Sequence, residues 1–280
     1  MSDSDGGQEG LDGNDGHHGH DGDAGAADPS SAPERPAGAP DPALIRSAMY
    51  SRWQEPPISQ LNTRGIEMRR LADSMRLIIE RLVATAAPTE AIIDAADELA
   101  RVALSFDRLQ PGTVYEGFSE AANVGADPHA SFEHSPFIGR ANPLAPPMHL
   151  QEIDGVVHGR VVFGSAYEGP PGCVHGGYVA AVFDELLGAT QSMAGHPGMT
   201  GTLKVIYRSP TPLHAELHYV GKLTRVEGRK IFTEGTVTAN GVLCAEAEGI
   251  FISIDFSKFA TMKAEREEAE RSRLAAAGDT

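Results

Sequence analysis

Residues 172–193 read GCVHGGYVAAVFDELLGATQSM, and this stretch decides the fold expected of the whole chain. From His175 to about Met193 the apolar residues are spaced as on a helix, whereas the flanking segments alternate with a period of two. A sheet with one apolar face must cover that face, and this helix is the available partner. The sequence therefore predicts a single central helix enclosed by β-strands.

Six strands are predicted around this helix, two before it and four after it. Asn240-Gly241 is a strong hairpin signal, because both central positions of a type I′ turn require positive φ. The turns between the last four strands are too short for parallel crossovers. The expected fold class is therefore α+β, with one antiparallel sheet wrapped around a central helix. The predicted strands cover 148–153, 156–163, 202–207, 214–223, 231–237 and 242–254.

Composition and period divide the 280 residues into four regions. The first 40 residues hold nine Asp or Glu against one Arg and have little to bury, so we expect them to be disordered. Apolar residues at helical spacing between about 65 and 106 predict two amphipathic helices, the second opened by Pro88. The regions are a disordered acidic Gly/Asp-rich tail (1–40), a helical N-terminal region (41–110), the sheet-and-helix domain (111–256) and a charged C-terminal tail (257–280).

The charge and the apolar content exclude several classes of function. A net charge of −16 argues against binding to nucleic acid or to an anionic membrane surface. No run is long enough for a membrane span, and the acidic start is unlike a signal peptide, so a cytoplasmic protein is expected. Cys173 and Cys244 are too few for a disulfide scaffold. The histidines and aspartate of 17–21 have metal-binding side chains, but without a supporting fold we expect a polar tail and no metal site.

The central helix carries two features that point to chemistry. Asp184 follows Phe183 among apolar residues. The desolvation cost of a carboxylate on a half-buried helix has to be offset by a partner or by a function. Its neighbour Glu185 is expected to face water. Gly176-Gly177 opens the helix, where unpaired amides at the positive end of the helix dipole suit an oxyanion. Together they would supply what hydrolysis of an activated acyl group needs.

Each feature also has a plain structural interpretation. A Gly-Gly pair before a helix is often only a tight entry, and an Asp in a helix is usually exposed. His175 is more often a capping residue than a base, and no second ligand accompanies it at metal spacing. Cys173 could act as a nucleophile with His175, but two residues apart in a turn they point in different directions, and no third group is evident.

His175-Gly176-Gly177, with Asp184 nine positions after the His, resembles the PaaI-like branch of hotdog-fold acyl-CoA thioesterases. The stretches 199–213 and 226–230 agree with it, and the resemblance covers roughly residues 145–255. It implies a hotdog fold and hydrolysis of an acyl-CoA to the free acid and CoA, with CoA as part of the substrate and no separate cofactor. It also implies a homodimer or homotetramer, in which two subunits join their sheets and form each active site between them.

The resemblance implies a role for each residue of the motif. Asp184 would be the catalytic carboxylate, either attacking the thioester carbonyl or activating water. The amide of Gly176, or that of Gly177, would polarise the carbonyl, and His175 would shape the loop. Thr200 would place the water or the carboxylate, beside Asp184 of its own subunit.

Basic residues would meet the phosphates of CoA, and Arg208, Arg229 and Lys230 are the candidates, although exposed charges at strand ends are equally common. Some relatives place an Asn six residues before the His, where this chain has Gly169. Polarisation of the carbonyl would then rest on backbone amides alone.

Two other functions compete with a thioesterase. The chain could be a non-catalytic acyl-CoA-binding hotdog module whose N-terminal helices serve regulation or interaction. It could also be a hotdog hydratase, an alternative suggested by the run Gly139-Arg140-Ala141-Asn142-Pro143. The acid expected before this run is absent, however, and His149 is distant from it. The acyl group and the choice between dimer and tetramer stay open.

Overall fold

The computed structural model describes residues 53–107, 130–195, 198–254, 265 and 268–269, all of them within one compact unit, Pro40–Thr280. The predicted tail 1–40 and most of the predicted tail 257–280 lie outside the described residues. Among the described residues the helices are η1 (Ile58–Gln60), α2 (Thr63–Val83), α3 (Thr89–Phe106), α5 (Ala130–His134), η2 (Ser165–Tyr167) and α6 (Gly176–Ser192). The strands are β1 (His149–Ile153), β2 (Val156–Val162), β3 (Gly198–Tyr207), β4 (Glu216–Glu227), β5 (Lys230–Ala239) and β6 (Val242–Ser253).

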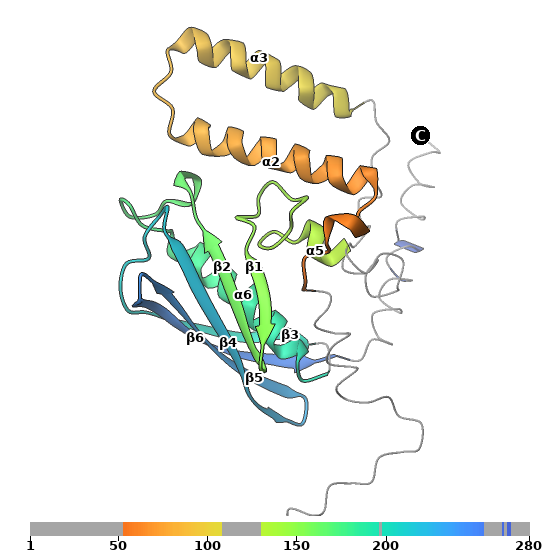
Figure 1. Ribbon diagram of the computed structural model, residues 1–280, viewed down its shortest axis with the longest axis vertical. Helices are drawn as coiled ribbons and strands as arrows, with labels where there is room; N and C mark the ends of the chain where they lie inside the picture. Colours follow the sequence, from red (N-terminus) through yellow and green to blue (C-terminus); the bar gives the residue numbers. More distant parts are fainter. Residues whose placement is uncertain (1–52, 108–129, 196–197, 255–264, 266–267, 270–280) are drawn as a thin grey trace, which may run out of the picture. The chain divides into compact units, whose positions relative to one another are not determined.

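The six strands form one antiparallel sheet in the order β1-β2-β4-β5-β6-β3, which curls around α6 (Figure 1). The predicted central helix, six strands and hotdog arrangement are confirmed. Asn240 and Gly241 have φ of 50° and 79°, so the predicted type I′ turn is also confirmed. This order leaves β3 at one edge of the sheet, with β6 as its single strand neighbour among the described residues.

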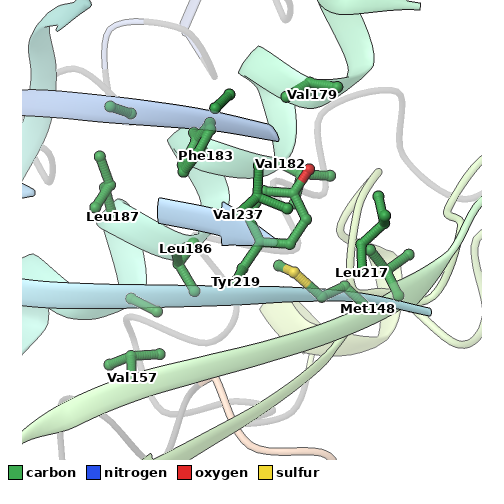
Figure 2. Packing of buried hydrophobic residues seen from close by; sticks show 14 of the residues in the cluster. Met148, Val157, Val179, Val182, Phe183, Leu186, Leu187, Leu217, Tyr219 and Val237 are labelled. Atoms are coloured by element: carbon green, nitrogen blue, oxygen red, sulfur yellow. The ribbon is translucent and has the colours of Figure 1, made fainter. Parts of the chain in front are cut away.

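The core lies between α6 and the inner face of the sheet (Figure 2). Alternate residues of β4 and β5 point inward onto one side of the helix, as the period of two requires. Tyr219 lies edge-on to Phe183 with ring centroids 5.1 Å apart, and both side chains are fully buried. The side of α6 that faces the sheet consists of Val179, Val182, Phe183, Leu186 and Leu187.

Small residues on the inner face let the sheet approach this helix closely. Gly221 and Gly235 are paired on neighbouring strands, and Gly249 lies on β6. A Cβ at Gly221 would lie 2.4 Å from Thr190 Oγ1 and 3.2 Å from Leu186, and one at Gly235 would lie 3.2 Å from Leu187. A Cβ at Gly249 would lie 2.6 Å from Thr233 Oγ1. The glycines at 221 and 235 therefore make room for side chains of α6, and this close fit is what lets one helix fill the curl of the sheet.

The two predicted N-terminal helices are confirmed as α2 and α3, and α2 is fixed to the domain by polar contacts. The Arg69 guanidinium pairs with Glu133 of α5 and with Glu55, and Arg69 and Glu133 are buried. Arg76 donates to the carbonyl oxygens of Asn142 and Arg140 at 2.7 and 2.9 Å. No residue of α3 is buried.

Leu186→Ala tests the packing of the central helix. Removing the fully buried side chain should lower the free energy of unfolding by about 2–5 kcal/mol, because the surrounding leucines and glycines cannot collapse into the space. The control is Leu82→Ala on α2, where the side chain is 57% exposed and the expected loss is below about 0.5 kcal/mol. Urea unfolding followed by circular dichroism measures both, and equal losses would contradict this packing.

Candidate functional site

Asp184 and Thr200 form the first half of the candidate site. The Thr200 hydroxyl, on β3, donates to Asp184 Oδ1 at 2.7 Å. Both residues are exposed in the single chain, and they lie where the edge strand passes α6. The expectation that Thr200 lies beside Asp184 of its own subunit is confirmed.

The burial of Asp184 and Glu185 is the reverse of the prediction. Asp184 was expected to be half-buried and is exposed, whereas Glu185 was expected to face water and is partly buried. Glu185 turns toward the loop after α5, where it accepts a hydrogen bond from Ser135 Oγ at 2.5 Å. The Ser135 hydroxyl also accepts from the backbone amide of Phe137 at 3.1 Å. Burial raises the pKa of Glu185 from 4.5 to about 7, with the Asp184 charge as a smaller cause.

The second half of the site is the start of α6. His175 is its N-cap, and its Nδ1 accepts from the Gly177 amide at 3.0 Å, so the predicted capping role is confirmed. This bond engages the Gly177 amide inside the turn. The Gly176 amide has no hydrogen-bond acceptor within the described residues, while the Gly176 carbonyl accepts from Tyr207 Oη at 2.7 Å. Of the two candidate oxyanion donors, Gly176 is the one with a free N–H.

An open pocket of about 390 Å³ lies at this end of the helix. Its lining residues include Cys173, Gly176 and Val179, together with Tyr207 and Arg208. It is mostly apolar, and Arg208 is the charged residue in its lining. The pocket is large enough for part of an extended ligand, and Gly176, whose amide is free, is among its lining residues.

The three basic candidates lie at opposite ends of the sheet. Arg208 follows the last residue of β3 and pairs with Glu246 at 2.5 Å. Arg229 donates to the carbonyl of Ser253, a residue that pairs with Gly198 at the start of β3. Lys230 follows Arg229 and makes no ion pair with any residue that the structure describes. Because β3 has ten residues, about 30 Å separates Arg208 from the other two within one chain.

Trp53 is a residue near the site that the sequence patterns do not reveal. Its indole N–H donates to Ser192 Oγ at 2.9 Å, and a Cβ at Gly188 would lie 3.3 Å from the indole ring. Asp184, Gly188 and Ser192 are four residues apart, so they share one face of α6. Trp53 therefore covers the helix face one turn beyond the carboxylate. No local pattern signals this contact, because it joins positions 139 residues apart.

The Asn-Pro run that prompted a hydratase is a structural turn. The Asn142 side chain donates to the His134 carbonyl at 3.1 Å and accepts from the Leu144 amide at 3.0 Å. His149 lies next to Glu55, at 3.2 Å. These contacts occupy the polar groups of Asn142 in closing its loop.

No group of three or more His, Cys, Asp or Glu side chains suited to a metal ion occurs in the described part of the chain. Within the same ranges, no helix has both the length and the apolar character that crossing a membrane requires.

An antiparallel sheet curled around one central helix defines the hotdog class of proteins. A family model described as the thioesterase superfamily matches residues 171–245. A crystal structure described as a thioesterase superfamily protein is 33% identical, covers 72% of this chain and 95% of its own, and superposes with a TM-score of 0.62. The chain therefore belongs to the thioesterase superfamily.

Two curated relatives carry more specific names. The acyl-coenzyme A thioesterase THEM4 of Xenopus laevis is 36% identical over 93 residues, which are 32% of this chain and 42% of the relative. Its Bos taurus counterpart is 35% identical over 100 residues, which are 35% of this chain and 41% of the relative. The chain thus spans about two fifths of the length of the curated relatives that it matches.

Glu185→Gln tests the buried carboxyl. Because burial raises the pKa of Glu185 to about 7, the native state keeps a proton that the unfolded chain loses above its ordinary value of 4.5. The stability that this group contributes is therefore lost as the pH rises from 4.5 to 7. Between about pH 5.5 and about pH 8, wild type should lose about 2 kcal/mol more unfolding free energy than Glu185→Gln. Urea unfolding at the two pH values measures this, and identical losses would refute the buried carboxyl.

Proposed function

We propose that the chain is an acyl-CoA thioesterase that hydrolyses an acyl-CoA to the free acid and CoA. The observation that carries this proposal is the pairing, on one helix, of the Asp184 carboxylate held by Thr200 with the unpaired Gly176 amide at an open pocket. The names of the curated relatives support the same activity. The spacing of His175-Gly176-Gly177 and Asp184 supports membership of the PaaI-like branch.

Each active site would take its two halves from two copies of the chain. Gly176 and Asp184 are eight residues apart on α6, so about 12 Å of helix separates them. A thioester carbonyl within hydrogen-bond distance of the Gly176 amide therefore lies beyond the reach of Asp184 in the same chain. A second copy that brings its own Asp184 to this pocket would complete the site.

The β3 edge is the surface that would join the two copies. An exposed edge strand of ten residues is a template for pairing with another strand. Met199 near its start and Tyr207 at its end are 60% and 53% exposed. Pairing β3 with β3 of a second copy in antiparallel orientation would set the Tyr207 end of one beside the Gly198 end of the other. That arrangement brings Gly176 of one copy toward Asp184 of the other, and the resulting homodimer could assemble further into a homotetramer.

The same pairing would bring together the basic residues proposed to bind CoA. Arg208 of one copy would approach Arg229 and Lys230 of its partner, although the three are distant within one chain. Arginine and lysine so placed could pair with the CoA phosphates at the rim of the pocket.

The chemistry needs few groups, because a thioester is already electrophilic and a thiolate leaves without strong acid assistance. The Gly176 amide would stabilise the negative charge that develops on the carbonyl oxygen. Asp184 would either attack the carbonyl carbon, forming an anhydride that water then hydrolyses, or take a proton from the attacking water. In both routes Thr200 holds the Asp184 carboxylate in place, and the products are the free acid and CoA.

Asp184→Asn tests the catalytic carboxylate. Asparagine keeps the shape and can neither attack nor accept the proton, so release of CoA thiol should fall by at least about 10³-fold. Acyl-CoA binding, followed by the fluorescence of Trp53, the single tryptophan, should persist. The control is Asp154→Asn in the β1–β2 turn, where φ of 51° suits asparagine. Unchanged thiol release from Asp184→Asn would reject this role, and binding without turnover in wild type would show a non-catalytic acyl-CoA-binding module.

Alkylation of Cys173 tests occupancy of the pocket independently of turnover. Cys173 lines the pocket and is partly exposed, whereas Cys244 is buried, so iodoacetamide should modify Cys173 first. Saturating CoA should slow this modification about tenfold, because the bound ligand covers the thiol. Mass spectrometry follows the reaction, with Cys173→Ser as the control for modification at other sites. An unchanged rate in the presence of CoA would place the ligand elsewhere.

A further inference from the structure

Glu80, near the end of α2, reaches across to the domain and binds backbone amides. Its carboxylate accepts from the amide of Ser165 at 2.9 Å and from that of Ala166 at 3.3 Å, the first two residues of η2. A Cβ at Gly164 would collide with this carboxylate, so the glycine lets it approach. These hydrogen bonds hold the pKa of Glu80 below its ordinary value, with the Ser165 amide as the main cause.

The short helix η2 is in turn tied to the turn that begins α6. The Tyr167 carbonyl, at the end of η2, accepts from the His175 amide at 2.9 Å. Between these two residues the chain forms a tight hairpin, with a bridge between Glu168 and Val174. The amide next along the chain from that of His175 is the free N–H of Gly176. Hydrogen bonds and the short backbone of η2 between them therefore connect Glu80 to the oxyanion turn.

The other polar contacts of α2 do not reach η2. Arg69 pairs with Glu133 and Glu55, and Arg76 donates to the loop at Arg140 and Asn142. Within the described residues, Glu80 supplies the hydrogen bonds between α2 and η2. A carboxylate is a strong acceptor for two amides at once, whereas a carboxamide has one acceptor oxygen and one NH₂ group.

We propose that Glu80 is a positioning residue for the reaction, because it fixes η2 and through η2 the turn that presents the Gly176 amide. Helix α2 then contributes to catalysis through Glu80, in addition to packing on the domain. This inference rests on the proposed thioesterase function, since it assigns the Gly176 amide to the carbonyl oxygen.

Glu80→Gln tests the positioning in kinetics. The variant should lower kcat for acyl-CoA hydrolysis by about tenfold with KM within about twofold, because a displaced amide weakens the interaction with the developing oxyanion more than substrate binding. Glu80→Asp, which keeps the charge on a shorter side chain, should recover part of the loss. The matched control is Glu67→Gln on the same helix, where the carboxylate is exposed and pairs only with Arg70 among the described residues.

Hydrogen exchange tests the same linkage without relying on turnover. In Glu80→Gln, peptides covering 164–168 and 172–178 should both exchange faster than in wild type, whereas β4 and β5 should keep their protection and show that the fold is intact. Faster exchange at 164–168 alone, or an unchanged kcat, would overturn the positioning role. Absence of hydrolysis in wild type would instead refute the proposed function, and the exchange data would still show whether Glu80 controls the turn.

Discussion

Burial of one side of α6 by a curled sheet is the constraint on which the rest of the structure depends. The sheet covers Val182, Phe183 and Leu186 completely, and the inner-face glycines bring it close enough to do so. The free first amide of the helix and the carboxylate of Asp184 lie outside the side that the sheet covers. They are the two groups that the proposed chemistry uses.

The same enclosure explains why one chain would not suffice. A rigid helix keeps Gly176 and Asp184 apart, and the unpaired edge of β3 passes both of them, with Thr200 at one end and Tyr207 at the other. Antiparallel pairing of two such edges would exchange the halves of the site between copies. Two residues of the N-terminal region would then support the site from outside the sheet. Trp53 covers the face of α6 one turn beyond Asp184, and Glu80 binds the amides of η2, which precedes the turn at Gly176.

Local patterns in the sequence predict the elements, and contacts between distant segments decide the site. The central helix and the Asn240-Gly241 turn follow from period and turn chemistry, which depend on neighbouring residues. The relative burial of Asp184 and Glu185 cannot be predicted in this way, because Glu185 bonds to the hydroxyl of Ser135, fifty residues away in the sequence. The contact of Thr200 with Asp184 is an implication of the resemblance to hotdog-fold thioesterases and of no local pattern. No local periodicity in the sequence signals the contact of Trp53 with Ser192 or the hydrogen bonds from Glu80 to η2.

The most direct test of a site shared between two copies is to mix two inactive variants, Asp184→Asn and Gly176→Pro. Proline removes the free amide and fits the first position of a helix, and His175 before it already has the extended backbone that proline requires (φ −59°, ψ 131°). Mixed dimers, identified by native mass spectrometry, would contain one intact site. An equal mixture should therefore regain about a quarter of wild-type turnover. If such mixed dimers form and remain as inactive as their parents, the shared site is contradicted.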